Sequence, residues 1–235
     1  MRLEIVDQKR LPKTSFIDGA ALYANPIKLI IKFFLKRNEL CINLLDVRSG
    51  NILDIGCGNG ILLPTLSKVN GMIIGLDIHE SLPSVKTYLN KNNFKNISLI
   101  QADTHSLPFK RSTFNSILLI STFDHLHKPR LALNELNRTI IPKGTVIFGF
   151  HVNNIGYYVI RIIFNFIYII SSFLVFHNFK EVLSHFLFKS DWRHLYSDSL
   201  LTQWISERLS IEEKKYLRVI YPVFVAIKSI SNKKD

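Results

Sequence analysis

The segment at residues 51–60, NILDIGCGNG, places three glycines at alternate positions directly after a short apolar run. Glycine has no Cβ and adopts positive φ readily, so a loop of this kind lets a ligand approach the backbone closely. The apolar run at 61–63 predicts that the chain restarts there as a helix whose first N–H groups face the loop. We therefore expect a strand, a glycine turn and a helix in succession, with a nucleotide-like small molecule bound in the turn.

The spacing of these glycines, at positions 56, 58 and 60, narrows the class of ligand. The dinucleotide fingerprint G-x-G-x-x-G requires its third glycine where this chain has Ile61, and a P-loop requires a lysine that the segment lacks. Asp54 precedes the loop, and its carboxylate would repel phosphate groups but suits a cation such as an α-ammonium group. The pattern favours a ligand that carries a positive charge and no phosphate.

Two further acids stand at the ends of apolar runs downstream. Residues 72–77, MIIGLD, predict a buried strand that ends in Asp77. An acid about 20 residues after a glycine loop is placed to accept hydrogen bonds from ribose hydroxyls. Residues 97–103, ISLIQAD, predict another strand, ending in Asp103. Because strand and helix signals alternate from 51 to 150, we expect an α/β fold with a parallel sheet covered on both faces.

The order of these motifs resembles the class I S-adenosylmethionine-dependent methyltransferases, in particular their UbiE-like branch. The resemblance rests on D-x-G-x-G-x-G at 54–60, Leu107-Pro108-Phe109 after the third strand, His125-Leu126 after the fourth at 114–120, and Ile141-Pro142-Lys143-Gly144 before the fifth at 145–150. It covers residues 45–150 well and 190–230 loosely. It implies a doubly wound, mostly parallel seven-stranded sheet of Rossmann-like type, with S-adenosyl-L-methionine as the cofactor.

The resemblance also implies which residues contact the cofactor. Asp54 and the glycine loop would hold its methionine part, Asp77 its ribose and Asp103 its adenine amino group. The end of the fourth strand would line the methyl-donating end. The expected contact set is Asp54, Gly56, Cys57, Gly58, Gly60, Asp77, Ile78, Asp103, Thr104, Ile120 and Ser121. Within this set, Cys57 is interpreted as a small packing residue of the loop rather than a reactive thiol.

Methyl transfer demands little of the side chains, because the cofactor supplies the electrophile and the protein mainly aligns the reactants. A general base helps when the acceptor must lose a proton. Three histidines after the fourth and fifth strands are candidates, His125, His127 and His151, with ordinary capping or surface positions as the alternative for each. Asp124 stands where the family often has a second histidine. His125 and His127 would face apart on a helix, so no metal site is expected.

The length of 235 residues suits one domain with an elaborated lid. The two cysteines, Cys41 and Cys57, are too few for a disulfide framework and indicate a reducing, cytosolic setting. We expect a helical lead-in at 1–46, a cofactor-binding core at 47–150, a hydrophobic helical cap at 151–190, and a closing helix with strands near 214–220 and 222–229 within 191–235.

The segment at 155–176 is long enough and apolar enough to span a membrane. A single polar stripe runs down it, made by Arg161, Asn165, Tyr168 and Ser172. The final strands of the resembled fold must also return to the same sheet, which disfavours a single crossing. We expect a cap over the substrate site whose apolar surface lines a pocket for a lipophilic acceptor or contacts a membrane. A fully buried structural cap is the alternative.

The chain carries 30 Lys and Arg against 18 Asp and Glu, a net charge of +12. This charge permits anionic partners, but the cations are scattered without interleaved aromatics, so no nucleic-acid partner is expected. The expected function is methyl transfer to a small, lipophilic acceptor by a cytoplasmic protein with peripheral membrane contact. Two alternatives stay open: a methyltransferase of RNA or protein, and a membrane-associated scaffold that keeps the fold without catalysis.

Overall fold

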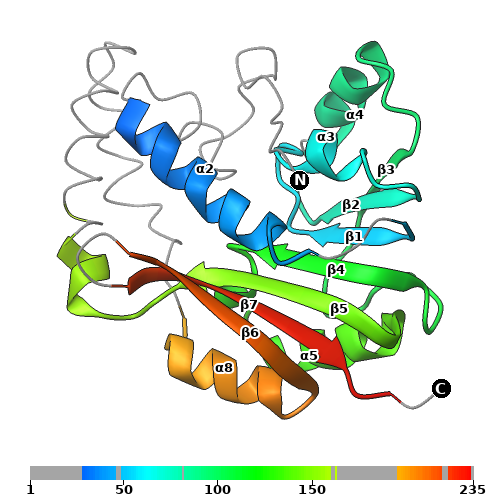
Figure 1. Ribbon diagram of the computed structural model, residues 1–235. Coiled ribbons are helices and arrows are strands. Elements are labelled where there is room, and N and C mark those ends of the chain that lie inside the picture. Colours follow the sequence, from blue (N-terminus) through cyan, green and yellow to red (C-terminus); the bar gives the residue numbers. More distant parts are fainter. Residues whose placement is uncertain are drawn as a thin grey trace.

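A computed structural model describes residues 28–45, 49–80, 82–159, 162, 195–218 and 222–233. Within them, seven strands form one sheet in the order β3-β2-β1-β4-β5-β7-β6 (Figure 1). Their bounds are β1 Ile52–Ile55, β2 Ile73–Asp77, β3 Ile97–Gln101, β4 Phe114–Ile120, β5 Ile140–His151, β6 Leu209–Arg218 and β7 Pro222–Ser231. Strands β1 to β5 run parallel, and β7 is antiparallel to both of its neighbours. The predicted doubly wound, mostly parallel sheet is confirmed.

Helices cover both faces of this sheet. On one face lie α2 (Lys28–Ile42), the single turn α3 (Leu63–Leu66) and α4 (Leu82–Lys91), and on the other lie α5 (Pro129–Thr139) and α8 (Asp198–Ser206). A short 3-10 turn, η2 (Phe123–His125), follows β4. Ser197 caps α8, since its hydroxyl accepts the Leu200 N–H at 3.3 Å.

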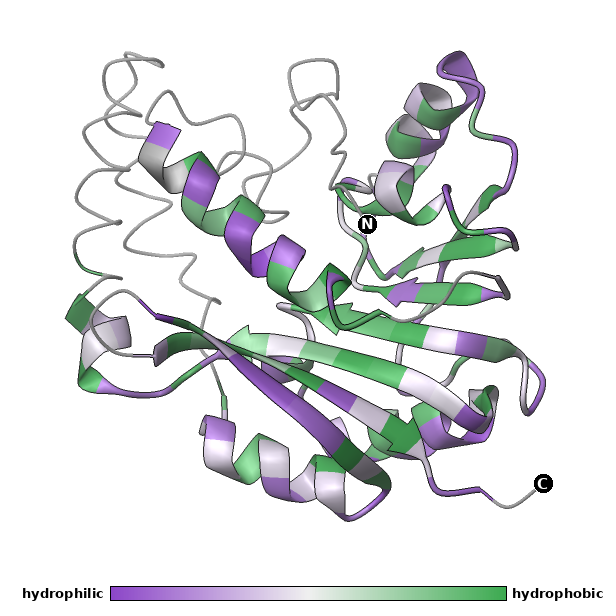
Figure 2. Cartoon of the chain, in the orientation of Figure 1, coloured by the Kyte–Doolittle hydropathy of each residue, from purple (hydrophilic) through white to green (hydrophobic). Residues whose placement is uncertain are grey.

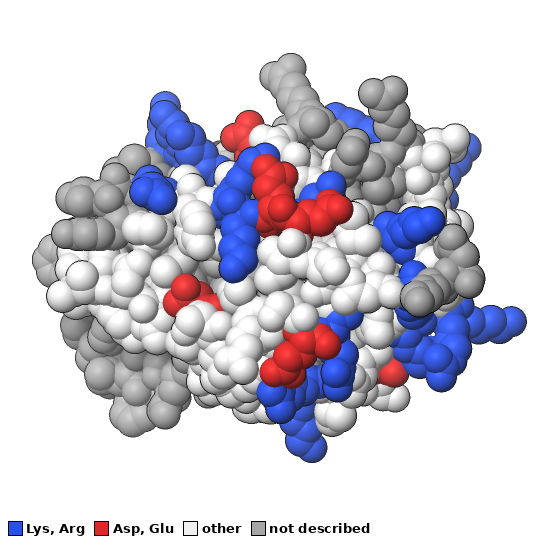
Figure 3. All heavy atoms as spheres, turned by 60° about the horizontal axis from the view of Figure 1, so that its bottom comes forward, with Lys and Arg blue, Asp and Glu red and all other residues white. Residues whose placement is uncertain are grey.

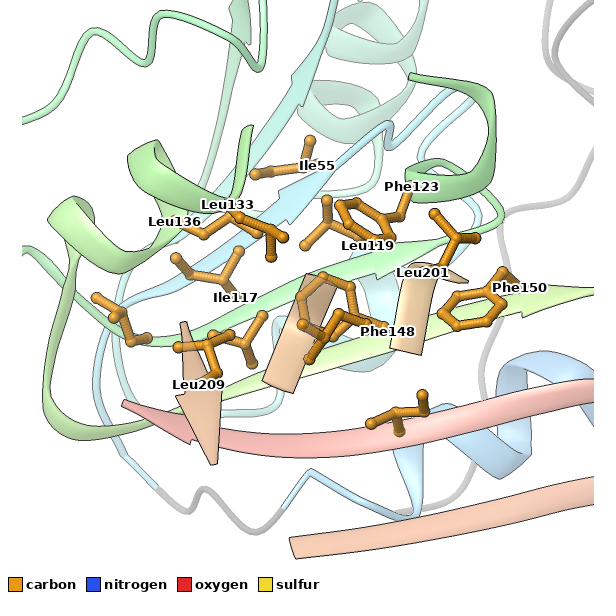
Figure 4. Packing of buried hydrophobic residues seen from close by; sticks show 14 of the residues in the cluster. Ile55, Ile117, Leu119, Phe123, Leu133, Leu136, Phe148, Phe150, Leu201 and Leu209 are labelled. Carbon is orange, nitrogen blue, oxygen red and sulfur yellow. The ribbon is translucent and has the colours of Figure 1, made fainter. Parts of the chain in front are cut away.

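The strands build a separate apolar core on each face. In β4, Ile117 and Leu119 face the α5 and α8 side, whereas Leu118 faces the α2 side. Figure 4 shows Ile117 and Leu119 packing with Leu133 of α5 and Phe148 of β5. Strands buried on both faces read as continuous apolar runs rather than alternating ones, and the central strands are correspondingly apolar in Figure 2.

Two expected elements near the glycine loop differ from the prediction. Strand β3 ends at Gln101, so Asp103 lies in the following turn, where its side chain accepts the His105 N–H at 2.9 Å. A side chain that bonds its own backbone in this way favours a turn over a strand. The expected helix after the loop is only the single turn α3, after which the backbone bonds tighten to the i→i−3 kind, from Lys68 to Thr65 and from Val69 to Leu66. The N–H groups of Gly56, Cys57, Gly58 and Gly60 all donate within the protein, so a ligand would approach this loop through the space left by the absent Cβ atoms.

Two predicted strand boundaries are also wrong. The sequence places the segment 141–144 before the fifth strand, but β5 already starts at Ile140. The strand therefore includes this segment, with a register shift against β4 and a positive φ of 57° at Lys143. Strand β6 starts at Leu209 rather than near 214, because buried Leu209 already pairs with Ser231. Neither change alters the sheet order.

The predicted lead-in before residue 28 and most of the predicted cap at 151–190 lie outside the described residues. Of the cap, the structure describes 151–159 and 162; residues 155–159 are helical. Four of its apolar side chains are exposed: Ile155, Tyr158, Val159 and Ile162. No described helix is both long and apolar enough to cross a membrane.

Candidate functional site

The glycine loop has the backbone conformation that its sequence predicts. Gly56, Gly58 and Gly60 adopt φ values of 72°, 49° and 71°. The N–H groups of Gly56 and Cys57 both donate to the Leu76 carbonyl, at 2.8 and 3.1 Å, and so fasten the loop to β2. Glycine adopts positive φ at lower cost than residues with a Cβ, which explains the alternate glycines.

Asp77 ties the loop to the end of β2. Its Oδ2 accepts the Gly58 N–H at 2.7 Å, and its Oδ1 accepts the His79 N–H at 3.1 Å. The sequence predicts a ribose contact for this carboxylate, which stays a prediction. The bond to Gly58 is a second role that the sequence did not indicate, because the two residues stand nineteen positions apart.

Asp54 is buried within β1, behind the loop. Burial raises the pKa of its carboxyl to about 7, and the nearby Asp77 carboxylate adds to this increase. Two carboxylates at the ends of adjacent parallel strands repel each other, and a cation between or beside them relieves that repulsion. The two carboxylates can accept hydrogen bonds from a cation, which fits the α-ammonium group of the expected cofactor.

The thiol of Cys57 is a packing group. Burial raises its pKa well above the ordinary value, and the Asp54 and Asp77 charges raise it further. A Cβ built on Gly75 would lie 3.0 Å from its sulfur, so the thiol fills the space above β2. A thiol that stays protonated is a poor nucleophile, which agrees with the predicted packing role.

The expected adenine and ribose rim lies beyond β2 and β3. The Asp103 carboxylate is exposed, and hydrogen bonds from His105, first from the backbone N–H, hold its pKa below the usual range. Ile78 is 70% exposed, and the Gln101 amide donates to its carbonyl at 3.0 Å. Thr104 is buried beside Asp103. An exposed apolar side chain near an ionised acid suits a flat base that carries an amino group.

The end of β4 forms the opposite wall. Ser121 adopts a φ of 55°, and its N–H donates to the Gly149 carbonyl at 2.7 Å. Its hydroxyl is buried and has no hydrogen-bond partner among the described residues. The next residue, Thr122, donates its hydroxyl to the Ile55 carbonyl at 3.2 Å and packs against Gly56. Thr122 therefore joins the end of β4 to the glycine loop, and the cofactor contacts of its neighbours Ile120 and Ser121 stay a prediction.

The structure places two of the three candidate histidines beside one carboxylate and the third elsewhere. His125 and His151 lie on either side of the buried Asp124 carboxylate. His127 lies apart from them, near the surface, where its carbonyl accepts the Tyr196 hydroxyl at 2.9 Å. Arg37 of α2 reaches His151, a contact that no sequence signal indicated, since the two stand 114 positions apart. The described residues contain no group of three or more His, Cys, Asp or Glu that could hold a metal.

Comparison with known proteins agrees with this geometry. The family model described as "Methyltransferase domain" matches residues 53–148, which include the loop and all of β1 to β4 after Ile52. The ubiquinone/menaquinone biosynthesis C-methyltransferase UbiE of Wigglesworthia glossinidia brevipalpis is 30% identical over 101 residues, 41% of this chain and 40% of its own. A ubiquinone biosynthesis O-methyltransferase of Coxiella burnetii is 28% identical over 150 residues, 61% of this chain and 62% of its own.

The chain spans about half the length of the curated relatives it matches. Among solved structures, the N-methyltransferase NodS of Bradyrhizobium japonicum, in complex with S-adenosyl-L-homocysteine, superimposes with a TM-score of 0.62 at 14% identity. That match covers 93% of this chain and 94% of NodS. It shows a shared fold over nearly the full length.

Replacing Asp77 with alanine is expected to weaken S-adenosylmethionine binding about tenfold to hundredfold, because it removes both the predicted ribose acceptor and the Gly58 anchor. Calorimetric titration of the folded variant measures this loss. Asp198→Ala is the matched control, since that carboxylate accepts the Asn153 N–H, far from the glycine loop. Unchanged affinity in Asp77→Ala would show that the ribose lies elsewhere.

Proposed function

We propose that this chain methylates a small, lipophilic acceptor with S-adenosylmethionine, because residues 53–148 match a methyltransferase-domain family and are similar to UbiE. The observation that carries the proposal is the pairing of the positive-φ glycine loop with two neighbouring carboxylates, Asp54 and Asp77. That pairing fits a ligand with a cation and a diol, and disfavours a phosphate-bearing one.

The chain's own residues would bind and align the reactants. S-adenosylmethionine, when bound, supplies an electrophilic methyl group on a sulfonium sulfur. Asp54 would hold the ammonium group, Asp77 the ribose hydroxyls, and Asp103 with Ile78 the adenine. Ser121, whose buried hydroxyl lacks a partner among the described residues, would line the methyl-donating end. Alignment in a site closed to water lowers the barrier of such an in-line displacement.

The class of acceptor is inferred from the relatives. The names of the UbiE and ubiquinone O-methyltransferase relatives refer to quinone biosynthesis. Those names include both C- and O-methyltransferases, so they support a small aromatic acceptor without fixing the methylated atom. Methylation of RNA or protein is supported only by the net charge of +12. On the face in Figure 3, Lys and Arg form separate groups with acids among them, which is a poor footprint for nucleic acid.

Transfer of a labelled methyl group tests this function. The purified protein would receive S-[methyl-³H]adenosylmethionine with a short-chain prenyl catechol, a demethylated prenyl naphthoquinol, bulk RNA or a mixture of unfolded proteins. The proposal expects label in one of the two small aromatic probes and none in the macromolecules. Label in RNA or protein alone would indicate an RNA or a protein methyltransferase instead. Cofactor binding without methyl transfer would favour a scaffold protein that lacks catalysis.

A cytoplasmic location with peripheral membrane contact is the second part of the proposal. Ile155 and Ile162 are 74% and 69% exposed, close to the carboxyl end of β5 where the acceptor would enter. On nearby α2, Lys28 and Lys32 are exposed. Apolar side chains beside cations are the combination that binds anionic membrane surfaces. A lipophilic acceptor could then be taken directly from the bilayer.

Co-sedimentation with phosphatidylglycerol vesicles tests the membrane contact. Ile155→Ser combined with Ile162→Ser is expected to weaken vesicle binding about tenfold or more, because burying two such side chains contributes about 1.5–3 kcal/mol each when complete. Leu131→Ser is the matched control, since that side chain is exposed on α5 across the sheet. Equal binding by the double variant and the control would exclude this surface as the contact.

A further inference from the structure

The turn at residues 103–109 connects the predicted adenine contact to the core on the α5 face of the sheet. Asp103 stands at the start of this turn, shortly after β3. Near its end, Leu107 is buried in the core shared with α5, and Phe109 packs edge-on against Phe114 of β4, with 4.8 Å between the ring centroids. A turn has no strand ladder of its own, so its conformation depends on which groups satisfy its backbone.

An ion pair on α5 satisfies three backbone groups of this turn. Glu135 Oε2 accepts the Leu107 N–H at 2.8 Å. Arg138 donates to the Leu107 carbonyl at 2.8 Å and to the Phe109 carbonyl at 2.6 Å. The two side chains also bond each other, from Arg138 Nε to Glu135 Oε1 at 2.7 Å and from Nη2 to Oε2 at 2.6 Å. The Glu135–Arg138 pair is therefore a two-pronged pairing that also fastens the turn to α5.

Both members of the Glu135–Arg138 pair are charged at neutral pH. The hydrogen bond from Arg138, and after it the one from the Leu107 N–H, hold the pKa of Glu135 below its usual range. The Glu135 carboxylate in turn raises the pKa of Arg138. Hydrogen bonds that involve ionised groups are shorter and stronger than those between neutral groups. The end of the turn at Leu107 and Phe109 is thus held firmly.

The start of the turn has only local support. The Asp103 carbonyl accepts the Ser106 N–H at 3.0 Å. Its Oδ1 accepts the His105 N–H at 2.9 Å and lies 2.6 Å from His105 Nδ1. Among the described residues, the hydrogen bonds of Asp103 all lead to the turn itself. The place of its carboxylate relative to the sheet therefore depends on how the far end of the turn is anchored.

We propose that the Glu135–Arg138 pair is a positioning element that allows this chain to discriminate adenine from other bases, because it anchors the turn that carries Asp103; this rests on the proposed function. The exocyclic amino group of adenine donates a hydrogen bond to a carboxylate, whereas hypoxanthine presents a carbonyl oxygen at the same position. A site arranged to bond one group rejects the analogue that lacks it, provided that the acceptor is held in place.

Calorimetry with S-adenosylhomocysteine and S-inosylhomocysteine measures this discrimination without any acceptor. The wild-type protein is expected to bind the adenosyl compound about tenfold to hundredfold more tightly. Arg138→Met and Glu135→Ala are each expected to reduce that ratio to about threefold or less, chiefly by weakening the adenosyl compound. Arg138→Lys keeps the charge without the planar fork and should give an intermediate ratio.

Glu207→Gln is the matched control. This carboxylate pairs with Arg130 of the same helix, α5, at 2.8 Å, and makes no described contact with the turn. The variant is expected to keep the wild-type ratio. Thermal melting follows the stability of each variant separately, because a general loss of stability weakens both ligands alike and leaves their ratio unchanged.

A wild-type ratio in folded Arg138→Met and Glu135→Ala overturns the proposal. Equal binding of the two compounds by the wild-type protein, or binding of neither, overturns it as well, because Asp103 then does not bind the base. If the two variants do not fold, Arg138→Lys decides, and a wild-type ratio in it overturns the proposal. The proposed function fails on a different result, namely that the wild-type protein methylates neither small aromatic probe.

Discussion

Replacing Gly56 with alanine is expected to reduce S-adenosylmethionine affinity about 100-fold or more, equivalent to about 2.7 kcal/mol. A Cβ at this position would lie 2.1 Å from the Thr122 hydroxyl oxygen and 2.6 Å from its methyl carbon. The φ of 72° is strained for any residue with a side chain. Because the loop cannot keep its conformation, both its N–H bonds to Leu76 and the ligand surface are disturbed. Calorimetric titration measures the loss.

Two further variants separate the possible causes of the lost cofactor affinity in Gly56→Ala. Gly144→Ala is the control, because its Cβ would also be crowded, at 2.7 Å from Ile140, but at the opposite end of the sheet. It is expected to lower stability and leave cofactor affinity unchanged. Thr122→Ala combined with Gly56→Ala should restore affinity only in part, since the positive φ remains. Full affinity in Gly56→Ala alone would show that the cofactor does not depend on this loop.

Binding of S-adenosylmethionine is expected to release protons at pH 6, because burial raises the pKa of the free Asp54 carboxyl to about 7 and leaves it mostly protonated at that pH. The α-ammonium group of S-adenosylmethionine would favour the ionised form of the Asp54 carboxyl and so lower the pKa of that carboxyl. Affinity should therefore rise with pH as it approaches about 7 from below. Calorimetry in two buffers of different ionisation enthalpy measures the released protons. Asp54→Asn should abolish the release and weaken binding.

The nucleoside 5′-methylthioadenosine provides the ligand control. It keeps the adenosine and a thioether but has no ammonium group, so it should bind without proton release. Release with this compound as well would assign the proton to another group. Proton-neutral binding of S-adenosylmethionine at pH 6 would mean that Asp54 does not face the ammonium.

The same carboxyl affects the stability of the free protein. In the unfolded chain it ionises near the ordinary aspartate pKa of 3.8, whereas in the folded chain it stays protonated up to about 7. The folded state thus binds more protons in this interval, and this group's contribution to stability falls as pH rises through it. Above about pH 7 the loss is complete and constant.

The sequence predicted the parts of the fold that periodicity and special residues encode. Local rules predict the apolar strands, the glycine loop and the acids near the strand ends. The family resemblance then predicts how the strands are arranged in one sheet. Local rules could not place Asp103 outside its strand, since that depends on its side chain bonding the His105 N–H. Nor could they foresee that α3 is a single turn, after which Lys68 and Val69 form i→i−3 bonds.

The candidate site was predictable only in part for the same reason. Asp54, Asp77 and the loop lie within one stretch of recognisable spacing. The cluster around Asp124 joins α2, η2 and the end of β5, and its members are brought together only by the folded sheet. The sequence offered three candidate histidines, and it could not indicate that Arg37 of α2 contacts His151.

Calorimetric titration of the wild-type protein with S-adenosylmethionine, with NAD as the comparison ligand, tests the central claim most directly. The loop, with its carboxylate pair and no phosphate-binding lysine, predicts micromolar binding of S-adenosylmethionine and none of NAD. Binding of NAD in its place, or of neither ligand, would contradict the account.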